Sequence, residues 1–239
     1  KNDRLKNISN FSGSAGIAII LKKKNYLFID GRYTIQAQQE SGKNFNIVEI
    51  HKTLPHKIIK NYNLGYDPTL FTSKNLKNYF LNNNLIPVNN NLIDQIFKFR
   101  EKKTKPFYSL KKNIVGETHL SKILKIANFL KSNKADYLFT SAPENVAWLL
   151  NIRGYDNPNS PIPNARLIID KNKKLFFITQ KKNTKKIIKE KVVNKNQVID
   201  IKDLPDLING LKGKNFIIDN KSCSIFYENI IKSKFKILD

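Results

Sequence analysis

The sequence is poor in the residues that most often carry chemistry. Its 239 residues include one cysteine, three histidines and no methionine. The single Cys223 excludes an internal disulfide and a cysteine-based zinc site, and it fits a reducing, cytoplasmic compartment. None of His51, His56 and His119 stands in a His-Glu-x-x-His or comparable ligand pattern. We therefore expect no metal site and no catalytic residue in this chain.

Long apolar runs and a signal sequence are also missing. The longest apolar stretches, such as Gly16–Leu21 and Leu175–Thr179, fall well short of the roughly 20 residues that span a bilayer. The start has no basic segment, apolar segment and cleavage site in series. We expect no membrane partner. Because the sequence opens on Lys1 and lacks methionine, we expect it to be a piece of a longer chain.

Acidic residues are few beside basic ones. The 43 Lys and Arg residues against 19 Asp and Glu residues give a net charge of +24, which is typical of nucleic-acid binders. Here the excess is nearly all lysine and is spread along the chain, with abundant Asn and Ile. That usage is the one an AT-rich genome produces, so it does not favour a nucleic-acid partner. A basic nucleic-acid binder is kept as a third hypothesis, behind the enzyme segment and the scaffold described below.

The predicted order of elements occurs twice. Each half has a short helical segment, an apolar hairpin, a helix and a strand, and later a strand that ends in an Asp turn. The matching segments are Arg4–Gly13 with Asn145–Gly154, Ile19-Ile20 with Ile168-Ile169, Leu27–Ile29 with Phe176–Ile178, and Gly65–Asp67 with Ile217–Asp219. The fold class is therefore α/β: two tandem domains, residues 1–108 and 109–239, each a mixed β-sheet flanked by helices.

The second copy begins with elements that the first copy lacks. We predict a helix at Glu117–Ser132 and a strand at Ala135–Thr140, whose counterparts would precede Lys1. We therefore expect the first copy to expose an unpaired sheet edge. Elsewhere we predict helices at Leu54–Tyr62 and Lys182–Val193.

Several landmarks together resemble the aminopeptidase P family, within the creatinase and prolidase superfamily. They run over essentially the whole chain. They are Phe-Ser-Gly-Ser-Ala-Gly at 11–16, Asp-Gly-Arg-Tyr at 30–33, Gly-Tyr-Asp-Pro at 65–68, and Trp-Leu-Leu-Asn-Ile-Arg-Gly at 148–154. We expect Trp148 itself to pack in the core.

The resemblance implies a three-domain enzyme. Two creatinase N-terminal-like domains would precede a "pita-bread" catalytic domain that binds two divalent metals, typically manganese, through two Asp, one His and two Glu. Such enzymes remove an N-terminal residue that precedes proline, and the full-length enzyme would be a homodimer. The present chain would then shape access for peptides with proline in second position and build subunit contacts, without activity of its own. The alternative is a free-standing scaffold or dimerisation module.

Five residues are candidates for contact with substrate. A strand end followed by a glycine turn can project Arg32 from Asp30-Gly-Arg-Tyr33, and the rigid fork of arginine suits a carboxylate. The other reading is an internal Asp30–Arg32 or cross-domain ion pair. In the second half, Arg153 and Asp156 border a polar, proline-rich loop that either approaches the catalytic domain or is a plain surface loop. The Ser-Gly-rich 12–16 segment lacks Gly-x-Ser-x-Gly spacing, so we expect a tight turn there, not a nucleophile.

Overall fold

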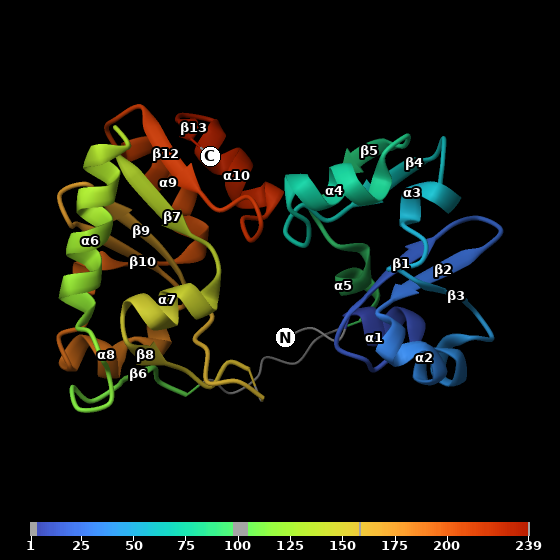
Figure 1. Ribbon diagram of the computed structural model, residues 1–239, viewed down its shortest axis with the longest axis horizontal. Coiled ribbons are helices and arrows are strands. Elements are labelled where there is room, and N and C mark those ends of the chain that lie inside the picture. Colours follow the sequence, from blue (N-terminus) through green and yellow to red (C-terminus); the bar gives the residue numbers. More distant parts are fainter. Residues whose placement is uncertain (1–3, 98–104, 158, 239) are drawn as a thin grey trace. The chain divides into compact units, whose positions relative to one another are not determined.

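The chain divides into two compact units. The computed structural model describes residues 4–97, 105–157 and 159–238 (Figure 1). Unit 1 ends at Glu101 and unit 2 begins at Lys102. Phe107 is fully buried in a core cluster of unit 2, and Tyr108 pairs with Arg153. Both residues therefore belong to unit 2. Unit 2 begins seven residues earlier than the second domain expected from the sequence, which started at residue 109. In the described ranges no helix is long and apolar enough to cross a membrane.

Unit 2 is built on a six-stranded mixed sheet in the order β11-β10-β9-β7-β12-β13 (Figure 1). β9 runs antiparallel to both β10 and β7, and the other neighbours are parallel. β7 therefore has an antiparallel neighbour, β9, on one edge and a parallel neighbour, β12, on the other. The strands are β7 (Tyr137–Thr140), β9 (Arg166–Asp170), β10 (Leu175–Ile178), β11 (Val198–Ile199), β12 (Asn215–Ile218) and β13 (Lys236–Leu238).

Helices cover both faces of this sheet. Leu167 of β9 lies in the core cluster that includes α6, α7 and α8, and its neighbour Ile168 lies in the cluster that includes α9 and α10. Successive strand residues point to opposite faces, so a strand buried on both sides is apolar throughout. The remaining elements are β6 (Tyr108–Ser109), α6 (His119–Ser132), α7 (Pro143–Leu149), β8 (Ile152–Arg153), η2 (Lys181–Asn183), α8 (Lys185–Lys189), η3 (Lys195–Gln197), η4 (Ile201–Asp203), α9 (Leu204–Gly210) and α10 (Ile225–Lys232).

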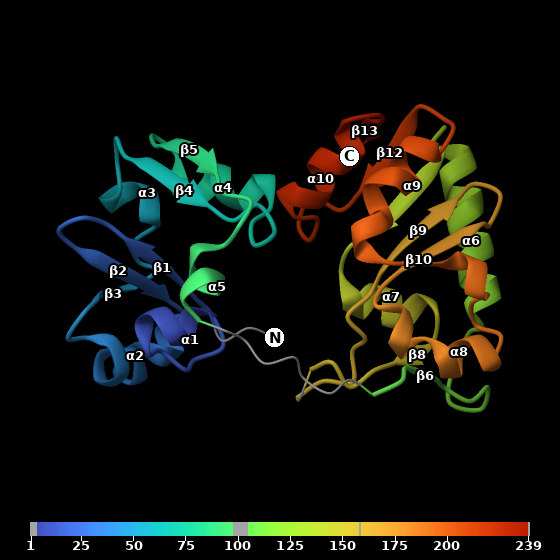
Figure 2. The ribbon, with the colours of Figure 1, turned by 180° about the vertical axis from the view of Figure 1, so that it is seen from behind.

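Unit 1 repeats most of these elements but splits its strands between two sheets. One sheet has the order β1-β2-β3, and the other is a parallel pair of β4 and β5. The two sheets of unit 1 are separate in the front view of Figure 1 and in the rear view of Figure 2. The elements are α1 (Arg4–Ser9), β1 (Gly16–Ile20), β2 (Asn25–Ile29), η1 (Gly31–Tyr33), α2 (Thr34–Ser41), β3 (Asn46–Glu49), α3 (Pro55–Ile58), β4 (Asn63–Tyr66), α4 (Ser73–Phe80), β5 (Asn84–Pro87) and α5 (Leu92–Ile96).

Backbone details support the internal duplication. α1 and α7 are each followed by an asparagine in the left-handed region, Asn10 at φ 64° and Asn151 at φ 53°. α4 begins at Ser73 and α10 at Ile225, and both helices have eight residues. The Asp67 carboxylate accepts from the backbone N–H two residues later, as Asp219 does in unit 2. The two units are therefore built on one plan.

The second strand of the hairpin needs a one-residue correction. The alignment above matches Leu27–Ile29 with Phe176–Ile178. In the structure Leu27 faces the core below α1 and α2, as Phe177 faces the core below α7 and α8. Because strand faces alternate, Leu27 must correspond to Phe177. The hairpin turn of unit 1 is one residue shorter than that of unit 2, which hid the shift in the sequence.

Unit 1 has no counterpart of β7 among the described residues. In unit 2, β7 pairs with β9 on one side and β12 on the other. The corresponding strands of unit 1, β1 and β4, each end a sheet. β1 and β4 thus each have one edge without a strand partner among the described residues.

Two predicted helices are shorter than expected. The helix predicted at Leu54–Tyr62 covers only α3, because Ile59 is extended and Asn61 has φ 62°. The helix predicted at Lys182–Val193 reduces to η2 and α8. In both segments the apolar residues face the core from turns as well as from helix, so their spacing did not reveal where the helix ends.

Trp148 is not a core residue, contrary to expectation. Its side chain is 59% exposed, because α7 buries its other face through Val146 and Leu149. The residue buried beside it is Lys122 of α6. The Lys122 ammonium lies 3.9 Å from the indole centroid and donates to Trp148 O at 2.6 Å and Asn151 Oδ1 at 2.7 Å. A lysine therefore ties α6 to the end of α7.

Replacing Lys122 with methionine should destabilise unit 2 by about 1–3 kcal/mol, because the buried Asn151 amide oxygen loses its donor. Urea denaturation followed by the fluorescence of the single tryptophan measures the change. Lys125→Met is the control on the same helix, since Lys125 is exposed and forms a surface ion pair with Glu117. We expect that variant to stay within about 0.5 kcal/mol of the parent chain. Equal midpoints for the two variants would contradict the role of Lys122.

Candidate functional site

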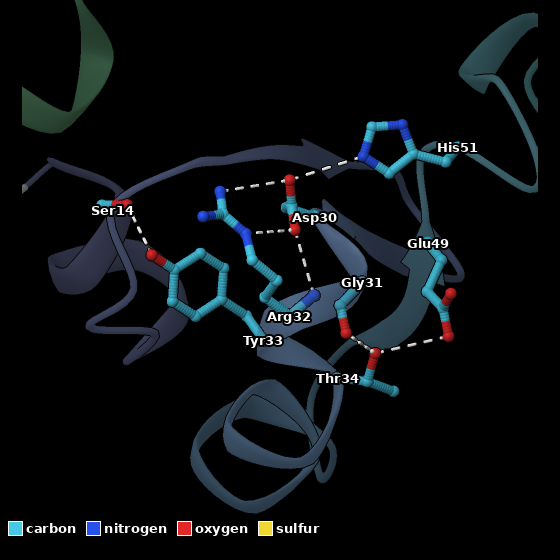
Figure 3. A network of polar contacts seen from close by, with 8 residues as sticks. All are labelled: Ser14, Asp30, Gly31, Arg32, Tyr33, Thr34, Glu49 and His51. Carbon is cyan, nitrogen blue, oxygen red and sulfur yellow. Dashed lines mark hydrogen bonds and ion pairs between the residues drawn. The ribbon is translucent and has the colours of Figure 1, made fainter.

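The turn after β2 brings three of the five candidate residues together (Figure 3). β2 ends at Ile29, and Asp30 caps the following turn of 3-10 helix by accepting from the Arg32 backbone N–H at 3.0 Å. An aspartate is favoured at this position because its short side chain reaches the free N–H groups of the first turn. The cap fixes the backbone position of Arg32.

Arg32 lies on the outside of this turn, held by Asp30. Its Nε donates to Asp30 Oδ1 at 2.9 Å, and its second contact reaches Asp30 Oδ2 at 3.4 Å. The side chain is nonetheless 77% exposed. The internal ion pair considered from the sequence is therefore present, and it leaves the guanidinium open to solvent.

The surrounding residues fix the turn from both sides. The Tyr33 hydroxyl shares a hydrogen bond of 2.7 Å with Ser14, and its ring packs edge-on against the buried Phe11. Thr34 donates to Gly31 O at 2.8 Å and also contacts Glu49 at the end of β3. The conformation of the turn is thus fixed by the contacts of Tyr33 and Thr34. It does not depend on the surface ion pair between Asp30 and Arg32, which is weak.

The electrostatics of the turn centre on Asp30. Hydrogen bonds from the Arg32 side chain and backbone hold the pKa of the Asp30 carboxyl well below its ordinary value, and a weaker contact from His51 Nε2 at 3.4 Å acts in the same direction. Asp30 is therefore ionised at any physiological pH. The turn presents a carboxylate and a guanidinium side by side, which can bind a carboxylate through the arginine or an amine through the aspartate.

The serine- and glycine-rich segment before β1 has structural contacts. It forms the bend that leads into the hairpin, as expected. Ser12 donates through both its N–H and its hydroxyl to Glu40, each at 2.7 Å. A Cβ on Gly13 would lie 2.2 Å from the Phe11 ring, so only glycine fits there. The segment positions Ser14 against Tyr33, and Ser12 ties it to Glu40 of α2.

Arg153 of unit 2 is used internally. From β8 it donates to Ile152 O at 2.9 Å and to Ala147 O at 3.3 Å. These carbonyls lie near the end of α7, where a positive charge is favourable to the helix dipole. The side chain is half-buried, so it offers less of its guanidinium to a ligand than Arg32 does.

Asp156 holds the loop that follows β8. Its carboxylate accepts from the Asn164 N–H at 2.6 Å, and Gly154 N donates to Pro161 O at 3.0 Å. A Cβ on Gly154 would lie 2.8 Å from the Pro163 backbone. The loop is thus closed at its base by short-range contacts, one of which Asp156 makes. Arg153 contacts other groups, the carbonyls of Ile152 and Ala147.

The sequence did not identify every member of the Asp30 cluster. His51 contacts Asp30 and Ser14 contacts Tyr33, each from another turn of unit 1, and no motif in the sequence links them to these residues. The histidines give no metal centre: within the described ranges no three His, Cys, Asp or Glu residues lie close enough together to hold a metal ion. The residues present therefore do not fit a dinuclear site.

Sequence models of known families match both units. A model described as the creatinase/prolidase N-terminal domain matches residues 1–96, and a second with the same description matches residues 99–239. A probable Xaa-Pro aminopeptidase P of Laccaria bicolor is 30% identical over 192 residues, which cover 72% of this chain and 29% of the relative. Aminopeptidase P2 of Arabidopsis thaliana is 27% identical over 95% of this chain and 34% of its own length.

A solved structure has the same fold over nearly the whole chain. The crystal structure of X-prolyl aminopeptidase from Caenorhabditis elegans, described as a cytosolic enzyme with a di-nuclear active site, matches with a TM-score of 0.80. The match covers 98% of this chain and 42% of that one, at 22% identity. The chain therefore spans about a third of the length of the curated relatives it matches.

The depressed pKa of Asp30 can be tested directly. NMR titration of the Asp30 carboxyl should give a value well below that of an ordinary aspartate, and Arg32→Ala should raise it further than His51→Ala does, because the contacts with Arg32 are the stronger ones. A folded-state pKa below the unfolded one stabilises the fold above the ordinary aspartate pKa, and that contribution is lost as the pH falls through the folded value. An unchanged pKa in Arg32→Ala would contradict the assignment.

Proposed function

Since the chain belongs to the creatinase/prolidase N-terminal domain family, we propose that its two units are the non-catalytic N-terminal region of a metal-dependent Xaa-Pro aminopeptidase. The observation that carries the proposal is the tandem: two such domains in succession, aligned with Xaa-Pro aminopeptidases over 72% and 95% of the chain. The parent enzyme would remove an N-terminal residue that precedes proline. It would act in the cytosol, as its structural relative from Caenorhabditis elegans does.

The metals belong to the rest of the parent protein in this proposal. Since the described residues do not fit a metal centre, the two divalent ions, manganese in our proposal, would be held by a catalytic domain outside these 239 residues. This chain contributes no step of the hydrolysis. Its contribution is to binding: it would narrow the entrance to the active site so that short peptides enter, and it would supply contacts within a homodimer.

The Asp30–Arg32 pair is the proposed contact with substrate. A peptide carries a carboxylate at its C-terminus, and an exposed guanidinium fork pairs with a carboxylate through two parallel hydrogen bonds. Asp30 would hold the Arg32 side chain in one orientation, which reduces the entropy lost on binding. Tyr33 supports the pair from below, with its ring 5.7 Å from the Arg32 guanidinium carbon.

Arg153 and Asp156 take a different part in the proposal. Asp156 fixes the loop after β8 by accepting from the Asn164 N–H, and Arg153 binds carbonyls of residues that precede that loop. We therefore assign to both residues the positioning of the loop and not a direct contact with peptide. The loop would face the catalytic domain and form part of the entrance. Loops held by a rigid scaffold commonly carry such contacts.

The 239-residue chain alone should not cleave an Xaa-Pro peptide. We expect no release of the N-terminal residue from an Xaa-Pro-Xaa tripeptide with Mn²⁺ added, measured by chromatography, while the full-length parent enzyme releases it. Chelator-sensitive cleavage by the chain alone would refute the proposal. Reading the coding sequence beyond Asp239 separates it from a free-standing scaffold: a stop codon without an Asp, His and Glu ligand set favours the scaffold.

Arg32→Ala in the full-length enzyme should raise KM for a tripeptide by at least roughly tenfold with kcat little changed. Loss of a charge-assisted hydrogen bond costs about 1.5–3 kcal/mol, and a contact made equally in ground and transition states acts on KM. Arg32→Lys, a point charge without the fork, should recover only part of the loss. Lys52→Ala is the control, because Lys52 is a similarly exposed cation paired with Glu49. Wild-type constants in Arg32→Ala would exclude the contact.

A further inference from the structure

A histidine lies beside the Asp30–Arg32 pair. His51 stands in the turn between β3 and α3, and its Nε2 is 3.4 Å from Asp30 Oδ2. Its side chain is 71% exposed, whereas that of Asp30 is 25% exposed. Figure 3 shows Arg32 and His51 reaching the Asp30 carboxylate from different sides. The carboxylate is thus a partly covered anion between two exposed side chains that can each carry a positive charge.

The two oxygens of Asp30 are bonded unequally. Oδ1 accepts from the Arg32 backbone N–H at 3.0 Å and from Arg32 Nε at 2.9 Å. Oδ2 has two longer contacts, with Arg32 Nη2 and with His51 Nε2, each at 3.4 Å. His51 and the Arg32 Nη2 therefore share one oxygen. A stronger bond from His51 would weaken the Nη2 contact, while the bonds to Oδ1 would still hold the arginine in place.

The charge of His51 decides the net charge of this part of unit 1. Asp30 is ionised and is paired with Arg32, and Glu49 is paired with Lys52 at 2.9 Å. These are the charged groups that contact His51 or its neighbours in the two turns, and each pair is neutral as a whole. The pKa of Glu49 is lowered by Lys52 first and, more weakly, by the charge of His51. A neutral pair attracts a distant carboxylate only weakly, because its two charges act in opposite directions.

Protonation of His51 would favour a bound carboxylate in two ways. An imidazolium donates from both ring nitrogens, so its bond to Asp30 Oδ2 becomes charge-assisted and draws that oxygen away from Arg32 Nη2. The Nη2 group is then free for a ligand. The added charge also makes the two turns positive, which attracts an anion to the exposed guanidinium. Histidine is the side chain whose charge ordinarily changes between about pH 5 and pH 8.

We propose that His51 is a positioning residue for the Asp30–Arg32 pair, and that its protonated form strengthens the binding of the C-terminal carboxylate of a short peptide at Arg32. The inference rests on the proposed function of Arg32 as a contact with substrate. It adds that the affinity for peptides with a free C-terminus increases as the pH falls. A peptide that ends in an amide should not show this increase through His51.

The experiment compares KM for an Xaa-Pro-Xaa tripeptide at about pH 5.5 and about pH 8 in the full-length enzyme. His51→Gln keeps an N–H donor and removes the titratable charge. The ratio of the variant's KM to the wild-type KM cancels the titration of catalytic groups and of the substrate amine. We expect a ratio near one at the higher pH and roughly two to five at the lower pH, the range typical of exposed charge pairs. His51→Lys, which is charged at both pH values, should lower KM by a similar factor at the higher pH.

Two controls isolate the contact. His56→Gln is the matched variant, because His56 belongs to the same unit and its Nδ1 lies 2.9 Å from Asn78 O, not beside Asp30. Its KM ratio should be the same at both pH values. The second control is the same tripeptide with a C-terminal amide, for which His51→Gln should give a ratio near one throughout.

The outcomes separate this inference from the proposed function. If Arg32→Ala raises KM while the ratio for His51→Gln is the same at both pH values, the role of His51 is excluded and the Arg32 contact stands. Wild-type KM in Arg32→Ala would overturn both. An equally large pH-dependent ratio for the amide peptide would mean that His51 does not act on the carboxylate, and it would also overturn the inference.

Discussion

The pairing of one central strand governs the architecture of both units. β7 bonds on its two edges to strands of opposite direction, β9 and β12, and so joins the two halves of the sheet. With it, unit 2 has one sheet with a core on each face. In unit 1 the corresponding strand is absent from the described residues, and the same elements form two sheets. Backbone hydrogen bonds are obligatory in the interior of a protein, so the pairing of this one strand decides whether the elements of a unit form one sheet or two.

The position of the Asp30 turn follows from the same strand geometry. β2 is the middle strand of its sheet, fully buried over its last three residues, and the chain must leave it at Ile29. Asp30 caps the turn that follows and at the same time holds Arg32. In unit 2 the equivalent turn, η2, has lysines and asparagine and no such cap. The duplicated scaffold therefore carries a charged pair in one copy only, where the proposed contact with peptide lies.

The high positive charge has little part in the fold. Most ion pairs in the described residues join an exposed lysine to a single acid, as for Lys52 and Lys171, and such pairs add little stability. Lys122 is the exception, because it is buried and its ammonium satisfies groups at the end of α7. Its pKa is lowered by burial, so the contacts with Trp148 and Asn151 must offset the cost of removing the charge from water.

The sequence alone determined the α/β class, the tandem duplication and the position of the Asp30 turn. These depend on the order of apolar strands, turn residues and glycines, which is local information that each segment carries in itself. Tertiary structure decided the rest. It exposed Trp148 and buried Lys122, shortened two helices, and brought His51 and Ser14 to Asp30 and Tyr33. Those outcomes depend on which residues distant in the sequence meet across the sheet, and a one-residue difference in a hairpin turn is enough to change which face a side chain takes.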